Sequence, residues 1–295
     1  MKDLESLTIE QLKAGECSVE RALLVVSGLE SEKEVAAYQR KLDLLQQGFE
    51  RRDNALGTSS FCTAAALFYY LWRSRSDRYN GDYLLATVID NQLAGNRAVG
   101  NCLGLTSLYS VLGVRLGLDL AVFEGKRYPD EGNPHVLNVL ITRNGSRIAV
   151  ENTTPSGFSV ELTEFQRQNY AKKDLIYLVA STCNSRGSTK KNLEDFQGAI
   201  SDYNKALQID PNYAIAYNNR GVAKMHLGDF KGAISDYNKA LQIDPGSPAI
   251  YNNRGIAKEN LGDLIGAISD YNKALQIDPK YTTAHNNLSM ATQRL

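Results

Sequence analysis

The sequence predicts an α+β domain followed by an all-α solenoid of helical repeats. The first prediction depends on helical hydrophobic spacing that gives way, after about residue 117, to the shorter period of β-strands. The second depends on a segment that recurs almost unchanged every 34 residues. A chain of 295 residues is long enough to give each domain its own core, and we place the domains at 1–175 and 176–295.

The composition argues against nucleic acid, membrane and metal as partners. The 33 basic residues balance the 33 acidic ones, so no excess charge attracts a polyanion. The chain begins without the pattern of a secretory signal, and its longest apolar stretch, Ala64 to Trp72, is too short to cross a bilayer. The cysteines lack the paired spacing of disulfides or a zinc site, so we expect a cytoplasmic protein with reduced thiols and no cofactor. They are Cys17, Cys62, Cys102 and Cys183.

Three helices are predicted between residues 30 and 100. Ser31 and Glu34 form a capping box, and apolar residues follow them at helical spacing. The stretch 60–74 is almost wholly apolar, which predicts a buried helix with Cys62 packed in the core. A third helix is predicted over about 83–93.

A fourth helix is predicted over 102–116, after a turn and a cap at Gly100 and Asn101. Leucines spaced three and four residues apart give it one apolar stripe, and Gly117 ends it. The stripe consists of Leu105, Leu108, Leu112 and Leu116.

Three strands are predicted after this helix, from their β-branched and apolar residues, over 120–123, 135–141 and 147–150. Asn144-Gly145 is typical of a tight hairpin turn and joins the last two strands. The polar run Lys172-Lys173-Asp174 is expected to separate the two domains.

Three side chains of the first domain suggest a nucleophilic cysteine enzyme. Cys102 occupies the predicted helix start, where the helix dipole and unpaired backbone N–H groups favour the thiolate. His135 opens one strand of the hairpin, and Glu151 follows the other. An imidazole can hold a thiolate as an ion pair and later return a proton to a leaving group. We therefore expect acyl transfer through a thioester on Cys102.

This order of residues resembles the transglutaminase-like superfamily, whose cysteine enzymes are related in architecture to papain-type proteases. The matching segments are Gly100-Asn101-Cys102, Asn133 to Val136 and Ala149 to Thr153, within about 80–160. The resemblance implies that Cys102 is the nucleophile, that His135 is its base and later its acid, and that Glu151 orients the imidazole. The chain departs from the family in having Glu151 where aspartate is usual and Leu137 where an aromatic residue is common.

The third member of this triad depends on the hairpin. A two-residue turn at 144–145 places Asn152, rather than Glu151, on the side of His135, and asparagine orients the imidazole in papain-like enzymes. A bulge or a longer loop restores Glu151. The alternative to catalysis is that Cys102 is an inert core thiol in a fold that has lost activity.

The C-terminal third is an array of near-identical units. The segment 233–245 recurs 34 residues earlier and 34 later, and the segment 217–221 recurs at 251–255 and weakly at 183–187. The small residues, paired tyrosines and closing proline of each unit resemble the tetratricopeptide repeat (TPR). Units are predicted at about 180–213, 214–247 and 248–281, with a capping helix over 282–295.

The resemblance to this repeat implies a superhelix whose concave side, lined by the first helix of each unit, holds a protein or peptide partner. Asparagines at equivalent positions of these helices would hydrogen-bond an extended backbone in the groove. They are Asn184, Asn218 and Asn252. The positions at which related proteins clamp a C-terminal carboxylate with lysine and asparagine are not matched by Asn218, Val222 and Met225, so we do not expect that ligand.

A second interpretation of the repeats needs no ligand. The asparagines, and the pairs Arg220–Lys224 and Arg254–Lys258, would then be a solvated surface copied with each duplication.

We therefore predict an intracellular transglutaminase-like cysteine hydrolase or protease whose repeats dock a substrate or an adaptor. The alternative is a non-catalytic TPR scaffold that carries a degenerate transglutaminase-like domain. The sequence leaves the substrate, the acyl acceptor and the oligomeric state open.

Overall fold

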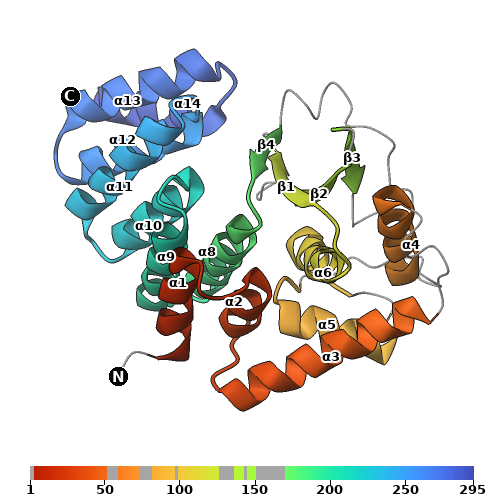
Figure 1. The fold of residues 1–295 in the computed structure, drawn as a ribbon. Helices are drawn as coiled ribbons and strands as arrows, with labels where there is room; N and C mark the ends of the chain where they lie inside the picture. The colour runs from red at the N-terminus through yellow and green to blue at the C-terminus, as the bar shows by residue number, and fades with distance from the viewer. Residues whose placement is uncertain are drawn as a thin grey trace. The chain divides into compact units, whose positions relative to one another are not determined.

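The structure is a computed structural model in which the chain divides into two units, residues 1–182 and 183–295. The described part of the first unit combines helices with a four-stranded sheet, and the second unit is helical (Figure 1). The residues that the structure describes are 3–51, 59–72, 82–96, 99–125, 136–142, 145–150 and 170–295.

Six described helices of the first unit precede its sheet, and five of them start at a side-chain cap. A backbone N–H group of the first turn donates a hydrogen bond to the side chain of the residue before the helix, which is Asp3, Ser18, Ser31, Ser59 or Asn101. The described helices are α1 (Leu4–Ala14), α2 (Val19–Val26), α3 (Glu32–Glu50), α4 (Ser60–Trp72), α5 (Leu85–Ala94) and α6 (Cys102–Arg115).

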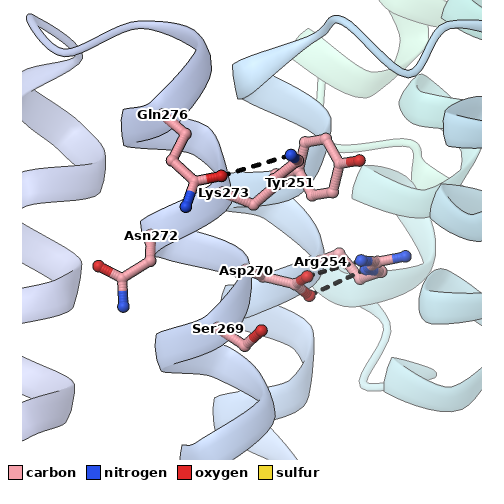
Figure 2. A pocket seen from close by; sticks show the side chains of 7 residues that line it. All are labelled: Tyr251, Arg254, Ser269, Asp270, Asn272, Lys273 and Gln276. Atoms are coloured by element: carbon pink, nitrogen blue, oxygen red, sulfur yellow. Dashed lines mark hydrogen bonds and ion pairs between the residues drawn. The ribbon is translucent and has the colours of Figure 1, made fainter.

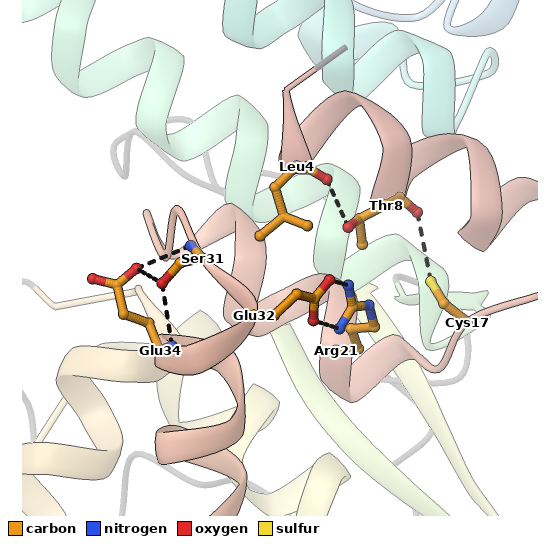
Figure 3. A network of polar contacts seen from close by, with 7 residues as sticks. All are labelled: Leu4, Thr8, Cys17, Arg21, Ser31, Glu32 and Glu34. Carbon is orange, nitrogen blue, oxygen red and sulfur yellow. Dashed lines mark hydrogen bonds and ion pairs between the residues drawn. The ribbon is translucent and has the colours of Figure 1, made fainter. Parts of the chain in front are cut away.

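The capping box predicted at the start of α3 is confirmed, and Figure 3 shows it beside the contacts of α1 and α2. Ser31 Oγ accepts a hydrogen bond from Glu34 N at 3.3 Å, and Glu34 Oε2 accepts one from Ser31 N at 3.0 Å. Arg21 of α2 pairs through both terminal nitrogens with Glu32, which joins α2 to the start of α3. Hydrogen bonding to Arg21 lowers the pKa of the Glu32 carboxyl.

Two expectations for the helices were wrong. Cys62 is exposed, so it does not pack in the core as predicted. The helix α6 has no single apolar stripe, because every residue from Leu103 to Gly113 is buried. It packs against α2, α4 and α5 as well as against strands of the sheet, and a helix surrounded by other elements is apolar on all sides.

The sheet is antiparallel throughout, with strand order β3-β2-β1-β4. One face holds an apolar cluster of odd-numbered residues that includes Phe123, Leu137 and Val139. The other face contacts α6, where Asn138 Nδ2 donates to Ser110 Oγ at 2.6 Å (Figure 1). The strands are β1 (Leu120–Gly125), β2 (Val136–Ile141), β3 (Arg147–Val150) and β4 (Tyr170–Lys173).

Two predicted connections differ from the structure. Ile141 pairs with Arg147, so five residues, not two, separate β2 from β3, and Thr142 N donates to Ser146 O at 3.0 Å within this loop. Lys172 and Lys173 are not a linker, because they lie in β4 and pair with β1. Lysines are common on edge strands, where their charge blocks pairing with another chain, and β4 lies at an edge of the sheet.

The second unit contains the three predicted helix pairs and the predicted last helix. Each second helix starts at an aspartate whose side chain accepts a hydrogen bond from a glycine N–H group three residues later. Among the described residues, no helix has the length and apolarity that a membrane span requires. The helices are α8 (Ile176–Asn192), which begins in the first unit, α9 (Phe196–Ile209), α10 (Ala214–His226), α11 (Phe230–Ile243), α12 (Pro248–Asn260), α13 (Leu264–Ile277) and α14 (Thr282–Gln293).

Candidate functional site

Cys102 is the first residue of α6 and is partly buried. The preceding Asn101 caps the helix, since its Oδ1 accepts a hydrogen bond from Gly104 N at 3.0 Å, and Asn101 N donates to Asp82 O at 2.7 Å. A Cβ atom at Gly104 would lie 2.7 Å from Val88 Cγ2, so this glycine lets the first turn approach α5 closely. The predicted helix start and cap are confirmed, and they hold the thiol at the end of α6 where backbone N–H groups are unpaired.

The partners predicted for this thiol, His135 and Glu151, lie outside the described residues, as does the alternative Asn152. The triad therefore stays a prediction. What the structure describes is the scaffold around it: Thr106 Oγ1 of α6 donates to Val136 O at 3.2 Å, which ties α6 to the first residue of β2.

The repeats of the second unit are held together by close contact between a glycine and a buried tyrosine. A Cβ atom at Gly221 would lie 2.7 Å from Tyr237 Cε1, and Gly187 and Gly255 have the same relation to Tyr203 and Tyr271. The three tyrosines are fully buried. Burial raises the pKa of all three hydroxyls, for Tyr203 to about 12.

A buried aspartate on the second helix of each repeat pairs with two cations of the first helix. Asp236 Oδ1 lies 2.6 Å from Arg220 Nη2, and Asp236 Oδ2 lies 2.8 Å from Lys224 Nζ. The same trio recurs as Arg254, Asp270 and Lys258 and as Arg186, Asp202 and Lys190. The interpretation of these cations as a solvated surface is therefore wrong. An aspartate that recurs 16 residues after each arginine was the available signal.

The asparagines predicted for the groove form hydrogen bonds between repeats, which we call the asparagine ladder. The Oδ1 atoms of Asn184, Asn218 and Asn252 each accept a bond from the side-chain amide of a residue 35 positions later. The donors are Asn219, Asn253 and Asn287, at 3.1, 3.1 and 2.9 Å. Asn184 and Asn252 are buried and Asn218 is half-buried. The ladder explains why these residues repeat, and their contact with a partner stays a prediction.

Stacked helix pairs with these contacts define a helical-repeat solenoid. The repeats are tetratricopeptide repeats: models described as tetratricopeptide repeat match residues 214–247 and 248–281, and one described as TPR repeat matches 189–228. The second unit is therefore a TPR protein-interaction module. No curated protein sequence matches the chain.

Solved TPR domains resemble this part of the chain. The first TPR of Spaghetti (RPAP3), bound to the HSP90 peptide SRMEEVD, is 29% identical, with a TM-score of 0.38, over 39% of this chain and 91% of that one. The Arabidopsis OM64 TPR domain is 25% identical, with a TM-score of 0.40, over 41% and 99%. The second TPR domain of human RPAP3, in complex with the HSP70 peptide SGPTIEEVD, is 25% identical, with a TM-score of 0.38, over 38% and 94%.

Proposed function

We propose that this protein is an adaptor whose TPR array binds an extended segment of a protein partner. The observation that carries this proposal is the match of residues 189–281 to TPR models, together with the inter-repeat bonds that keep the first helices in register. The asparagine ladder uses the Oδ1 atom of Asn218, and its Nδ2 also donates to Asn219 Oδ1 at 3.4 Å, so the second N–H of this half-buried amide is the group that remains for a peptide carbonyl.

The ligand is an internal segment rather than a free C-terminus. The peptides named for the Spaghetti and human RPAP3 domains are acidic. In this chain the corresponding helix presents Asn218, Val222 and Met225, all half-buried, and none of them is cationic. A groove of amides and apolar side chains suits backbone carbonyls and apolar residues better than a carboxylate.

The test is a selection of random dodecapeptides on the full chain, followed by affinity measurement with two variants. Val222→Lys puts a charge in the proposed groove and should weaken the selected peptides by at least about tenfold. Lys239→Gln changes an exposed residue of α11, a second helix, and should leave the affinity unchanged. Equal affinity for the Val222→Lys variant and the parent chain would contradict the proposal.

A second candidate function is cysteine-dependent acyl transfer by the first unit. Cys102 at the capped start of α6 supports it. In the described β2–β3 register, odd-numbered residues pair with odd-numbered ones, as Val139 does with Ala149, and this parity favours Glu151 over Asn152 as the partner of His135.

The alternation of side chains in this sheet also limits the proposal of acyl transfer by Cys102. Asn138, an even-numbered residue of β2, faces α6, and strict alternation assigns odd-numbered residues to the opposite face. Catalysis therefore requires a break in the alternation before Val136 that turns His135 toward Cys102. The non-catalytic alternative requires no such break, and for this reason we place the adaptor function first.

Alkylation kinetics decide between the two. Cys62 is exposed and would react whatever its role, so the experiment uses a Cys62→Ser background. Burial raises the pKa of the Cys17 thiol, so Cys17 serves as the slow internal reference. If Cys102 is catalytic, it should react with iodoacetamide below pH 7 faster than Cys17, and His135→Ala should slow it by about tenfold or more. An unchanged rate in His135→Ala would exclude the triad.

A further inference from the structure

In the second repeat, the tyrosine of α11 is fully buried, and its hydroxyl lacks a hydrogen-bond partner among the described residues. Burial raises the pKa of this Tyr237 hydroxyl, so the group keeps its proton and remains a donor. The adjacent carboxylate of Asp236 is already paired with Arg220. Figure 2 shows the equivalent pair of the third repeat, Arg254 and Asp270. A buried donor without a partner is costly, and a bound molecule can supply the acceptor that the chain does not.

The equivalent tyrosines find their partners on the first helix of their own repeat. Tyr203 contacts the hydroxyl of Ser188 on α8, and Tyr271 donates to the carboxylate of Glu259 on α12. These hydroxyls therefore lie close to the first helices, which line the proposed groove. The two partner positions are one helical turn apart within the repeat.

Apolar side chains occupy both of these positions in the second repeat. Val222 lies 34 residues after Ser188, and Met225 lies 34 residues before Glu259. Both pack on the apolar cluster that contains Tyr237, and both are half-buried, so they cover the cluster on the side of α10. Neither carries a nitrogen or an oxygen. Methionine is unbranched and flexible, so Met225 can turn aside for an incoming side chain.

We propose that the Tyr237 hydroxyl donates a hydrogen bond to the side-chain carbonyl of a glutamine in the partner segment, which enters where Met225 now lies. This inference rests on the proposed adaptor function and identifies one side chain of the bound segment. A glutamine side chain is unbranched and about as long as methionine, whereas a main-chain carbonyl is too close to its own backbone to reach a group beneath other side chains. Its N–H groups stay on the groove side, where water accepts their bonds.

The apolar surroundings favour a neutral acceptor over a carboxylate. Val222 and Met225 contribute no charge and no donor at this point of the groove. A glutamate that reached the same hydroxyl would bury a charge among them, at a much larger cost than a carboxamide. Glutamine is therefore expected rather than glutamate.

The test extends the selection of dodecapeptides on the full chain to a Tyr237→Phe variant. Glutamine should be enriched at one position with the parent chain and replaced there by an apolar residue with the variant, because phenylalanine has no donor. Tyr203→Phe is the matched control, since it removes a hydroxyl that already contacts Ser188, and it should retain the glutamine preference. Urea unfolding verifies that both variants are folded.

The affinity of one selected peptide is then compared with that of its methionine version. The glutamine peptide should bind the parent chain about tenfold more tightly, and this preference should vanish in Tyr237→Phe. A preference that persists in Tyr237→Phe, or no preference with the parent chain, would overturn the proposal. Undiminished binding by the Val222→Lys variant would instead contradict the groove itself.

A measurement without ligand tests whether position 225 gives access to the hydroxyl. Met225→Gln supplies a carbonyl at the position from which Glu259 accepts from Tyr271. It should raise the urea midpoint of the parent chain more than that of a Tyr237→Phe background. Met225→Leu supplies no acceptor and should shift the two midpoints equally. Equal shifts for Met225→Gln would place the hydroxyl out of reach from the groove and overturn the proposal.

Discussion

The hydroxyl of Tyr237 is buried without a hydrogen-bond partner among the described residues. Its equivalents in the neighbouring repeats have partners: Tyr203 OH lies 3.3 Å from Ser188 Oγ, and Tyr271 OH donates to Glu259 Oε2 at 2.9 Å. A buried polar group without a partner has lost its hydration and gained nothing in return. Identical residues in near-identical repeats thus differ in energy, because the side chain that faces each hydroxyl differs.

Replacing Tyr237 by phenylalanine should therefore leave the free energy of unfolding unchanged or raise it at pH 7. Tyr271→Phe, which removes a hydrogen bond to Glu259, should lower it by about 1 kcal/mol. Urea unfolding of the full chain, followed by circular dichroism, measures both. A larger decrease in the free energy of unfolding for Tyr237→Phe than for Tyr271→Phe would show that the Tyr237 hydroxyl has a hydrogen-bond partner.

The site residues were predictable to different degrees. The capping position of Asn101 and the start of the helix at Cys102 followed from local sequence, because a cap requires only its own first turn. The bond from Arg220 to Asp236 joins two helices, and the sequence interpretation assigned this arginine to a solvated surface. Pairing across helices depends on how they pack, although the 34-residue recurrence of both partners indicated it.

At the scale of elements, the close approach of the two helices in each repeat depends on its glycine. The glycine faces the ring of the tyrosine that follows it 16 residues later, as Gly221 faces Tyr237. Helix propensity alone favours alanine over glycine by about 1 kcal/mol, so the retained glycine reflects packing rather than local preference. The sequence predicted these helices, and their contact explains the glycine.

Gly221→Ala should destabilise the second unit by about 2 kcal/mol, because its Cβ atom would lie 2.7 Å from the ring of a fully buried tyrosine. The matched control is Gly246→Ala, where the nearest atom to the new Cβ is Asp244 Oδ1 at 3.6 Å. The control should change the stability by no more than about 0.5 kcal/mol. Equal unfolding midpoints in urea for the two variants would contradict the packing argument.

At the scale of the whole chain, fully buried tyrosines are found in both units. Burial raises the pKa of Tyr109 in the first unit and of Tyr203, Tyr237 and Tyr271 in the second. In the unfolded chain a tyrosine loses its proton near pH 10, while Tyr203 in the folded chain keeps its proton to about pH 12. Between these values the unfolded state binds fewer protons, so folding stability falls as the pH rises.

We expect the free energy of unfolding to be independent of these tyrosines below about pH 10 and to fall above it. The slope is about 1.4 kcal/mol per pH unit for each buried tyrosine. Urea unfolding at a series of pH values from 8 to 12 measures this slope. The Tyr203→Phe variant should have a slope smaller by the contribution of one buried tyrosine. Constant stability across this range would show that the hydroxyls ionise equally well in the folded chain.

The sequence by itself determined the helices α3 to α6, the caps of α3 and α6, the strands β1 to β3 and the helices of the 34-residue repeats, because these features depend on residues close together along the chain. Tertiary structure decided the rest. It placed Lys172 and Lys173 in an edge strand, surrounded α6 on all sides and set the register in which β2 pairs with β3. In the packed array, the repeated asparagines and arginines form hydrogen bonds between neighbouring repeats. Such contacts join segments distant in sequence, and their energy depends on a packing geometry that no local pattern contains.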